Sequence, residues 1–189
     1  MKKESGLSLI ESALVIMIAV SVISGVVFYW TGAKTSEELE YTQHMITHVQ
    51  QKVLALYANQ DEPDDDLSIS TLKLSNIKTK KNDKNTILLP GNIELRLQRT
   101  WGENDLTLSD ESRHRFYVIL SNLNADQCAV LGGGRYGKSG TFGGAYIYRD
   151  GTYKNIADLD MASRIAYCSQ KFDGHLGNIG LIFSIKGKM

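Results

Sequence analysis

The stretch GLSLIESALVIMIAVSVISGVVFYW, residues 6–30, decides the architecture of this 189-residue chain. Residues 13–30 are uncharged and mostly apolar, and a run of about this length can cross a bilayer as an α-helix. Tyr29 and Trp30 close the run with aromatic rings, which suit a membrane interface. Glu11 is the only charged residue of the stretch, and an ionised carboxylate in apolar surroundings usually faces a partner. The stretch therefore predicts a membrane-compatible helix in which Glu11 has a specific role.

Two simpler interpretations of this stretch fit less well. A secretory signal peptide also has basic residues before an apolar core, but here the apolar run is long, includes Glu11 and is followed by no Ala-x-Ala-like cleavage pattern. A plain single-pass anchor explains the length of the run and leaves Glu11 without a role.

The helix is expected to continue beyond the apolar run with one apolar stripe. Apolar residues recur there at helical spacing: Leu39, Ile46, Val49, Val53 and Leu56, with Met45 and Tyr57 beside them. Proline is absent until Pro63, so we expect one helix over residues 7–59, apolar on all sides over 7–30 and amphipathic over 31–59. The stripe predicts that the second half packs on a globular head.

Residues 60–189 are expected to form that head. Residues 60–90, with the acidic cluster DEPDDD and a lysine-rich stretch, are interpreted as a long solvated connection. Strands are predicted in IELRLQR, RFYVIL and GLIFSIK and in the hairpin AYIYRDGTYKN, and short helices in LNADQCAVL, with Asn124 as N-cap, and DLDMASRIAYC. The predicted fold class is α+β, a long helix packed on a mostly antiparallel sheet with short helices.

The two cysteines of the chain, Cys128 and Cys168, both lie in this head. If the anchor sends the head across the membrane, an even cysteine count favours a disulfide. In a cytoplasmic domain, two separate buried thiols would be the better interpretation.

Composition and motifs give no enzymatic or nucleic-acid function. Lys plus Arg and Asp plus Glu balance at 21 each, so nothing attracts the chain to nucleic acid as a whole. The sequence GGGRYGKS, residues 132–139, matches the phosphate-loop pattern, but its predicted flanks are a helix before and a strand after, so nucleotide binding is not expected. His44 and His48 have metal-compatible spacing, but a polar helix face is the better interpretation. No catalytic constellation, cofactor or metal site is predicted.

GLSLIE followed by an apolar helix resembles the class III signal of type IV prepilins. The matching features are a short charged leader (1–5), Gly6 before the cleavage point, Leu7 as first mature residue and Glu11 as the fifth. The resemblance implies that a prepilin peptidase cleaves after Gly6 and methylates the Leu7 amine. It also implies that Glu11 pairs with the N-terminal amine of an adjacent subunit during assembly.

Within that family, SLIESALV and SGVVFYW look closest to the type IVb branch and to bundle-forming pilins of enteric bacteria. The order of a strand, a helix with the first cysteine, a helix ending in the second and a last strand is similar to their C-terminal layout, and supports a Cys128–Cys168 disulfide. The resemblance implies a leader (1–6), a long helix (7–59) and a pilin head (60–189).

The function implied is that of a structural subunit, major or minor, of a surface fibre for adhesion or aggregation. Expected partners are other pilins in a filament, the prepilin peptidase and the inner-membrane assembly machinery. The subunit is expected in the inner membrane with its head in the periplasm, and then in an extracellular pilus. The alternative is a pseudopilin of a type II secretion system; the cysteines and the size of the head favour a true pilin.

Overall fold

A computed structural model of the chain describes residues 9–63, 67, 79–80, 83–99, 114–137, 140–149, 152–170 and 179–186. Two compact units are present, Met1–Glu37 and Glu38–Met189, and their boundary falls within the first helix, α1. The elements in chain order are α1 (Leu9–Leu56), β1 (Thr79–Lys80), β2 (Asp83–Leu88), the 3-10 helix η1 (Pro90–Asn92), β3 (Glu94–Gln98), β4 (Arg115–Ser121), α2 (Ala125–Gly132), β5 (Phe142–Arg149), β6 (Thr152–Asn155), α3 (Met161–Cys168) and β7 (Ile179–Ser184).

Helix α1 forms because its sequence has no proline and is rich in residues that tolerate helical backbone. Its hydroxyls do not interrupt it: Ser21 and Ser24 donate to the carbonyls of Met17 and Val20, one turn back. The helix ends at Leu56, and residues 57–59 continue as a turn, so the expected end near 59 is close to the observed one. Positions 7 and 8 of the expected helix lie outside the described residues.

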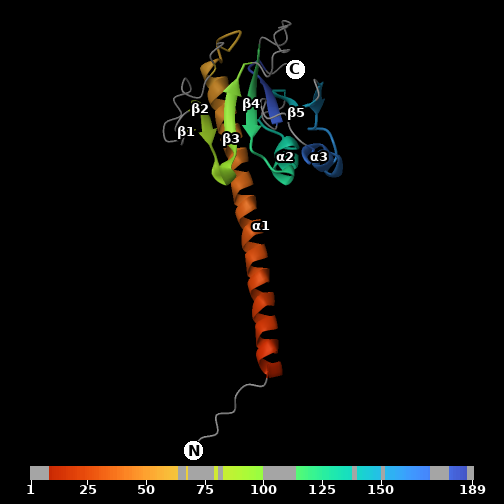
Figure 1. Ribbon diagram of the computed structural model, residues 1–189. Coiled ribbons are helices and arrows are strands. Elements are labelled where there is room, and N and C mark those ends of the chain that lie inside the picture. Colours follow the sequence, from red (N-terminus) through yellow and green to blue (C-terminus); the bar gives the residue numbers. More distant parts are fainter. Residues whose placement is uncertain are drawn as a thin grey trace, which may run out of the picture. The chain divides into compact units, whose positions relative to one another are not determined.

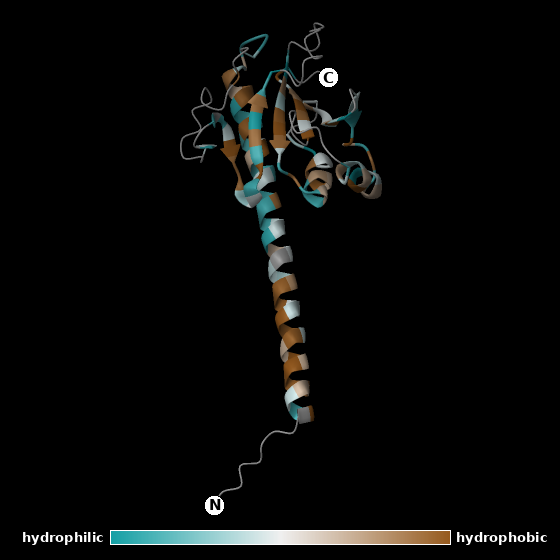
Figure 2. Cartoon of the chain, in the orientation of Figure 1, coloured by the Kyte–Doolittle hydropathy of each residue, from teal (hydrophilic) through white to brown (hydrophobic). Residues whose placement is uncertain are grey.

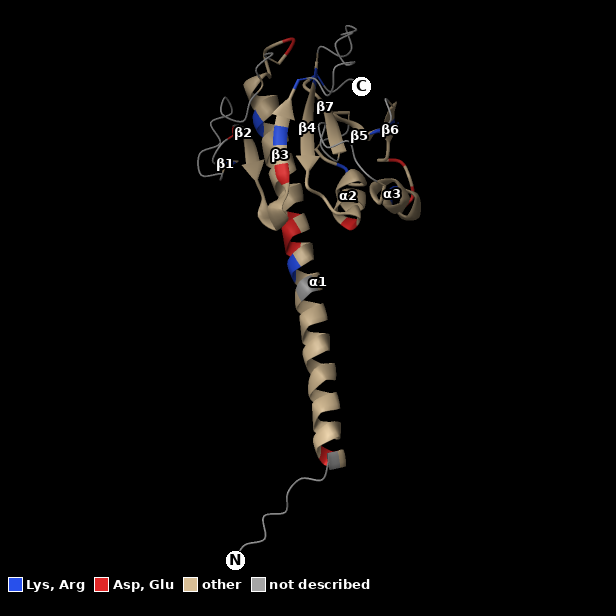
Figure 3. Cartoon of the chain, viewed as in Figure 1, with Lys and Arg blue, Asp and Glu red and all other residues tan. Residues whose placement is uncertain are grey.

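In the described part of the first unit, residues 9–37, the chain is helical and contributes no buried apolar residue. Large apolar side chains here are solvent-exposed; Ile10 is 72% exposed and Phe28 is 83% exposed. Figures 2 and 3 show this part of α1 as mostly hydrophobic and without acidic or basic residues between Glu11 and Lys34. By length and composition the helix can cross a membrane.

Within the second unit, the remainder of α1 is part of the core. Ile46, Val49 and Val53 are completely buried, and Tyr57 continues this i, i+4 series after the helix has ended. Leu56 was expected in the same stripe, but it is 52% exposed. Its position three residues after Val53 places it at the edge of the stripe, while Tyr57 takes the inward position.

In the described part of the chain, seven antiparallel strands form one sheet in the order β1-β2-β3-β4-β7-β5-β6 (Figures 1 and 3). The alternation predicted for residues 93–99 is confirmed: Leu95 and Leu97 are buried in the core, while Glu94 and Arg96 are half-buried on the other face. The strands predicted from residues 115–120, the hairpin and GLIFSIK are also present as β4, β5 with β6, and β7. The turn at 150–151 lies outside the described residues.

The interpretation of residues 60–90 as one long connection is wrong for its last part. Residues 79–88 contribute β1 and β2, and Ile87 of β2 pairs with Leu95 of β3. Strand β2, DKNTIL, has few apolar residues, and the core needs only the completely buried Ile87 from it. A strand near the sheet edge can be polar on most of its length because one neighbour is enough to fix its register.

Candidate functional site

Glu11 lies in the first turn of α1, at the positive end of the helix dipole. The side chain is exposed, as are the apolar side chains that follow it. Gly6 and Leu7, the residues predicted to be processed, lie outside the described residues. The described part of this region is thus a carboxylate at the start of an uncovered apolar helix.

The C-terminal region of the head is held together by a disulfide. Cys128 of α2 is bonded to Cys168, the last residue of α3, with the two Cα atoms 5.8 Å apart. Both cysteines are buried in the main core. The predicted cross-link between the two short helices is therefore present.

Each of these helices begins with a side-chain cap. The Asn124 side chain accepts from the Gln127 N–H at 2.8 Å, and Gln127 accepts in return from the Asn124 N–H, which completes a capping box. Asp160 accepts from the N–H and the hydroxyl of Ser163, and these hydrogen bonds hold the pKa of Asp160 below its usual value. Asn124 was predicted as a cap from sequence; Asp160 was not.

Two arginines add contacts that the sequence analysis missed. Arg164 of α3 donates to the Leu159 carbonyl from Nε and Nη2, at 3.0 and 2.6 Å, and to the Ala129 carbonyl of α2 from Nη1 at 3.2 Å. Arg149 of β5 donates to the Tyr167 carbonyl near the end of α3 at 2.9 Å. The position of Arg164 in a short helix that follows an Asp cap was the available signal for such contacts. The carbonyls that it binds can be identified only from the fold.

The glycine-rich segment after α2 is built around a buried tyrosine. The Tyr136 hydroxyl donates to the Leu131 carbonyl at 2.7 Å, and burial raises the pKa of this phenol. Gly137 has φ +75°, and a Cβ there would lie 2.0 Å from Gln50 Nε2 of α1. The glycine therefore allows the segment to lie directly against α1.

A phosphate-binding role for this segment receives no structural support. The segment follows helix α2 and precedes strand β5, which is the reverse of the strand–loop–helix order that holds phosphate. It lines an open cavity of about 450 Å³ whose charged lining residues are Arg135 and Asp158. Residues 138 and 139, which complete the motif, lie outside the described residues.

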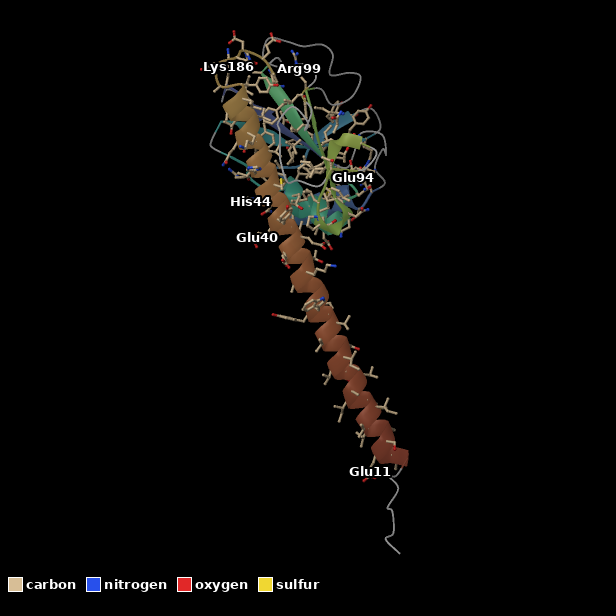
Figure 4. The ribbon with its side chains drawn as sticks, turned by 90° about the vertical axis from the view of Figure 1, so that its left-hand side faces the viewer. Glu11, Glu40, His44, Glu94, Arg99 and Lys186 are labelled. Carbon is tan, nitrogen blue, oxygen red and sulfur yellow. A yellow bond between two sulfur atoms is a disulfide. The ribbon has the colours of Figure 1, made fainter. Side chains whose placement is uncertain are left out.

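His44 and His48 lie on the outward face of α1, as expected. Their rings are stacked with centroids 6.5 Å apart, and Figure 4 shows His44 and Glu40 on the side of α1 away from the sheet. Among the residues that the structure describes, no three His, Cys, Asp or Glu side chains come together as a metal site.

The acidic segment after α1 was expected to be solvated, but its first two residues contact the head. Asp61 binds Lys186 after β7, and Glu62 binds Arg99 after β3 at 2.8 Å. His114, before β4, contacts the Asp61 carbonyl through Nδ1. The hydrogen bond from Lys186 lowers the pKa of the exposed Asp61 carboxyl. These contacts fasten the end of α1 to the ends of three strands.

Comparison with known proteins does not identify a family for the chain. No protein-family model, no curated protein and no solved structure gave a match.

Proposed function

We propose that this chain is a structural subunit, major or minor, of a type IVb pilus, and that its α1 helix forms part of the filament core. The observation that carries the proposal is the contrast within α1. Apolar residues from Met45 to Tyr57 are buried in the hydrophobic core of the head, whereas the large apolar residues from Ile10 to Trp30 are exposed. A contiguous apolar surface of this size requires lipid or other apolar helices around it.

In this proposal the leader is removed after Gly6, and the Leu7 amine is methylated. The subunit waits in the inner membrane with its head in the periplasm and then enters a filament with other pilins. A disulfide joining α2 and α3 agrees with a head that folds in an oxidising compartment. The proposed role is structural and involves no catalysis.

Glu11 aligns neighbouring subunits during assembly. In a low-dielectric bundle a carboxylate and an ammonium attract strongly, and either one alone is penalised. Pairing between Glu11 of one subunit and the Leu7 amine of its neighbour satisfies both charges. This pairing sets the register between successive helices.

The test compares two variants, Glu11→Ala and Glu37→Ala, each expressed as the sole copy of the gene. Glu37 is a matched control because it is an exposed glutamate on the same helix, outside the apolar run. We expect Glu11→Ala to reduce sheared surface fibres at least about tenfold while processed subunit in the membrane is maintained, because a lone amine is left in the apolar bundle. Glu37→Ala should assemble normally.

Intact-mass measurement of the mature protein tests processing in the same samples. The expected mass lacks residues 1–6 and carries one methyl group. A mature chain that retains residues 1–6, or normal fibres from Glu11→Ala, contradicts the proposal. Loss of protein secretion with surface fibres intact in a deletion strain would instead support the type II pseudopilin.

A further inference from the structure

Helix α3 presents its apolar side to solvent. Met161 is 48% exposed and Ile165 is 37% exposed, and Ala162 and Ala166 beside them are also exposed. In a surface helix of a globular protein the apolar side normally faces the core. The orientation of α3 is therefore the reverse of the usual one.

The inward contacts of α3 explain this orientation. Its inner side carries Cys168, which is bonded to α2, and Arg164, which binds carbonyls of α2 and of the preceding turn. The Tyr167 ring lies under the Lys154 ammonium, 5.8 Å from the ring centroid. Because these residues fix the rotation of the helix, Met161 and Ile165 point away from the head.

A second surface, exposed except at the half-buried His48, lies on α1. Tyr41, His44, His48 and Lys52 follow one another at spacings of three or four residues and so share one helix face. Tyr41 is 47% exposed, and the two histidine rings are stacked along this face. We call these four residues the α1 stripe. It combines aromatic surface with a cation at its C-terminal end.

The two surfaces complement each other in length and charge. Helix α3 has 8 residues, or about 12 Å, which is the same as the distance along the axis from His44 to Lys52. Asp158 and Asp160 are exposed at the start of α3, beside Met161. When the apolar side of α3 lies along the stripe with its start near Lys52, these carboxylates approach the cation.

We propose that the exposed side of α3 in one copy of this chain docks on the α1 stripe of the next copy. Because the two surfaces differ, the contact is heterologous, and such contacts continue as open filaments unless the rotation closes a ring. The inference rests on the proposed pilus function and adds to it the surfaces through which neighbouring heads touch.

The size of the surface is consistent with a contact that forms only inside a filament. Two partly exposed large side chains and two alanines supply far less than the roughly 800 Å² per partner of a stable complex. Subunits joined by their N-terminal helices are held at high effective concentration, so a weak contact is populated there and not between free heads. The proposed occupant is therefore a tethered second copy.

Site-specific cross-linking in purified fibres tests the contact. The variant His48→Cys/Ile165→Cys is treated with a short bismaleimide and run on denaturing gels, and peptide mass analysis checks that Cys128–Cys168 is intact. We expect a ladder of dimers, trimers and higher species. Each single variant should give monomer only. The control Leu88→Cys/Ile165→Cys should also give monomer, because Leu88, which is 40% exposed, lies on β2 and outside both proposed surfaces.

A second pair of variants removes the dependence on added cysteines. Ile165→Lys should lower fibre yield by about tenfold because it places a cation in an apolar contact, whereas Leu88→Lys should leave the yield unchanged. Fibres without a ladder, dimers from Ile165→Cys alone, or a normal yield from Ile165→Lys would overturn the docking and leave the pilus function standing. A wild-type chain that forms no fibres would overturn the pilus function and the docking with it.

Discussion

Removal of the disulfide should destabilise the head by about 4 kcal/mol. The perturbation is the double variant Cys128→Ala/Cys168→Ala, which removes the cross-link without burying a hydroxyl. The bonded cysteines are 40 residues apart, and closing a loop of that length in the unfolded chain corresponds to about 4 kcal/mol of entropy at 25 °C. Since domains are stable by only about 5–15 kcal/mol, much of the folding free energy is at stake.

The loss should be partly local. Without the cross-link, α3 is still held by Arg164 on the Ala129 carbonyl and by Arg149 on the Tyr167 carbonyl. Both hydrogen bonds are half-buried, and a hydrogen bond with a charged donor contributes about 1.5–3 kcal/mol. We therefore expect proteolytic cleavage to begin around α3 before the sheet unfolds.

The assay is urea unfolding of the full-length protein in detergent, followed by circular dichroism of the head and by limited proteolysis. Reduced wild type is the matched control, because reduction removes the cross-link and keeps both sulfur atoms. Both samples should lose about 4 kcal/mol relative to oxidised wild type. A loss below about 1 kcal/mol in both would refute the loop-entropy reasoning, and a loss in the variant alone would assign the effect to packing.

Three further predictions concern the same region. Gly133→Ala should lower the free energy of unfolding by about 1–3 kcal/mol, because its Cβ would lie 1.6 Å from Arg164 Nη1 and displace the guanidinium. In an Arg164→Met background the same substitution should be nearly neutral, and an equal loss of stability there would disprove the coupling. Asn124→Ala should lower the free energy of unfolding by about 1 kcal/mol, because it removes the capping box with Gln127. The urea midpoint measures this loss, and an unchanged midpoint would contradict a stabilising role of the cap. Asp160 has a depressed pKa, so its stabilising contribution is present above the pKa of the unfolded chain, near 4, and is lost as pH falls through the lower folded value. Asp160→Asn should flatten the acid limb of the stability–pH curve, and an unchanged limb would argue against this contribution.

The elements with strong periodicity could be read from the sequence because local pattern and burial agree in them. The buried apolar face of α1, the alternation of β3 and the Asn124 cap are examples. Strand β2 was missed because, among its described side chains, Ile87 alone is apolar and part of the core, and its register comes from pairing with β3. Local sequence does not carry that information.

The candidate site was predictable only where a residue acts alone or through chemistry specific to its type. Two cysteines indicate a disulfide if the head is expected to lie outside the cytoplasm, and a glutamate in an apolar run stands out from its neighbours. The rotation of α3 could not be predicted, because apolar spacing alone would have turned Met161 and Ile165 inward. The contacts of Arg164 and Cys168 with α2 turn these two side chains outward instead, and these contacts connect segments that are distant in sequence.

The place of β7 in the sheet has a consequence for biogenesis. Among the described strands β7 is the last in sequence, yet it lies between β4 and β5 and joins strands β1–β4 to the β5–β6 hairpin within the sheet. During synthesis from the N-terminus, two sheet fragments therefore keep open edges until residues 179–184 are added. Cys168 precedes β7, so oxidation can join α3 to α2 before the sheet closes. In a chain that folds as it is synthesised, the interval before β7 is added therefore determines how long these open edges can pair with other chains.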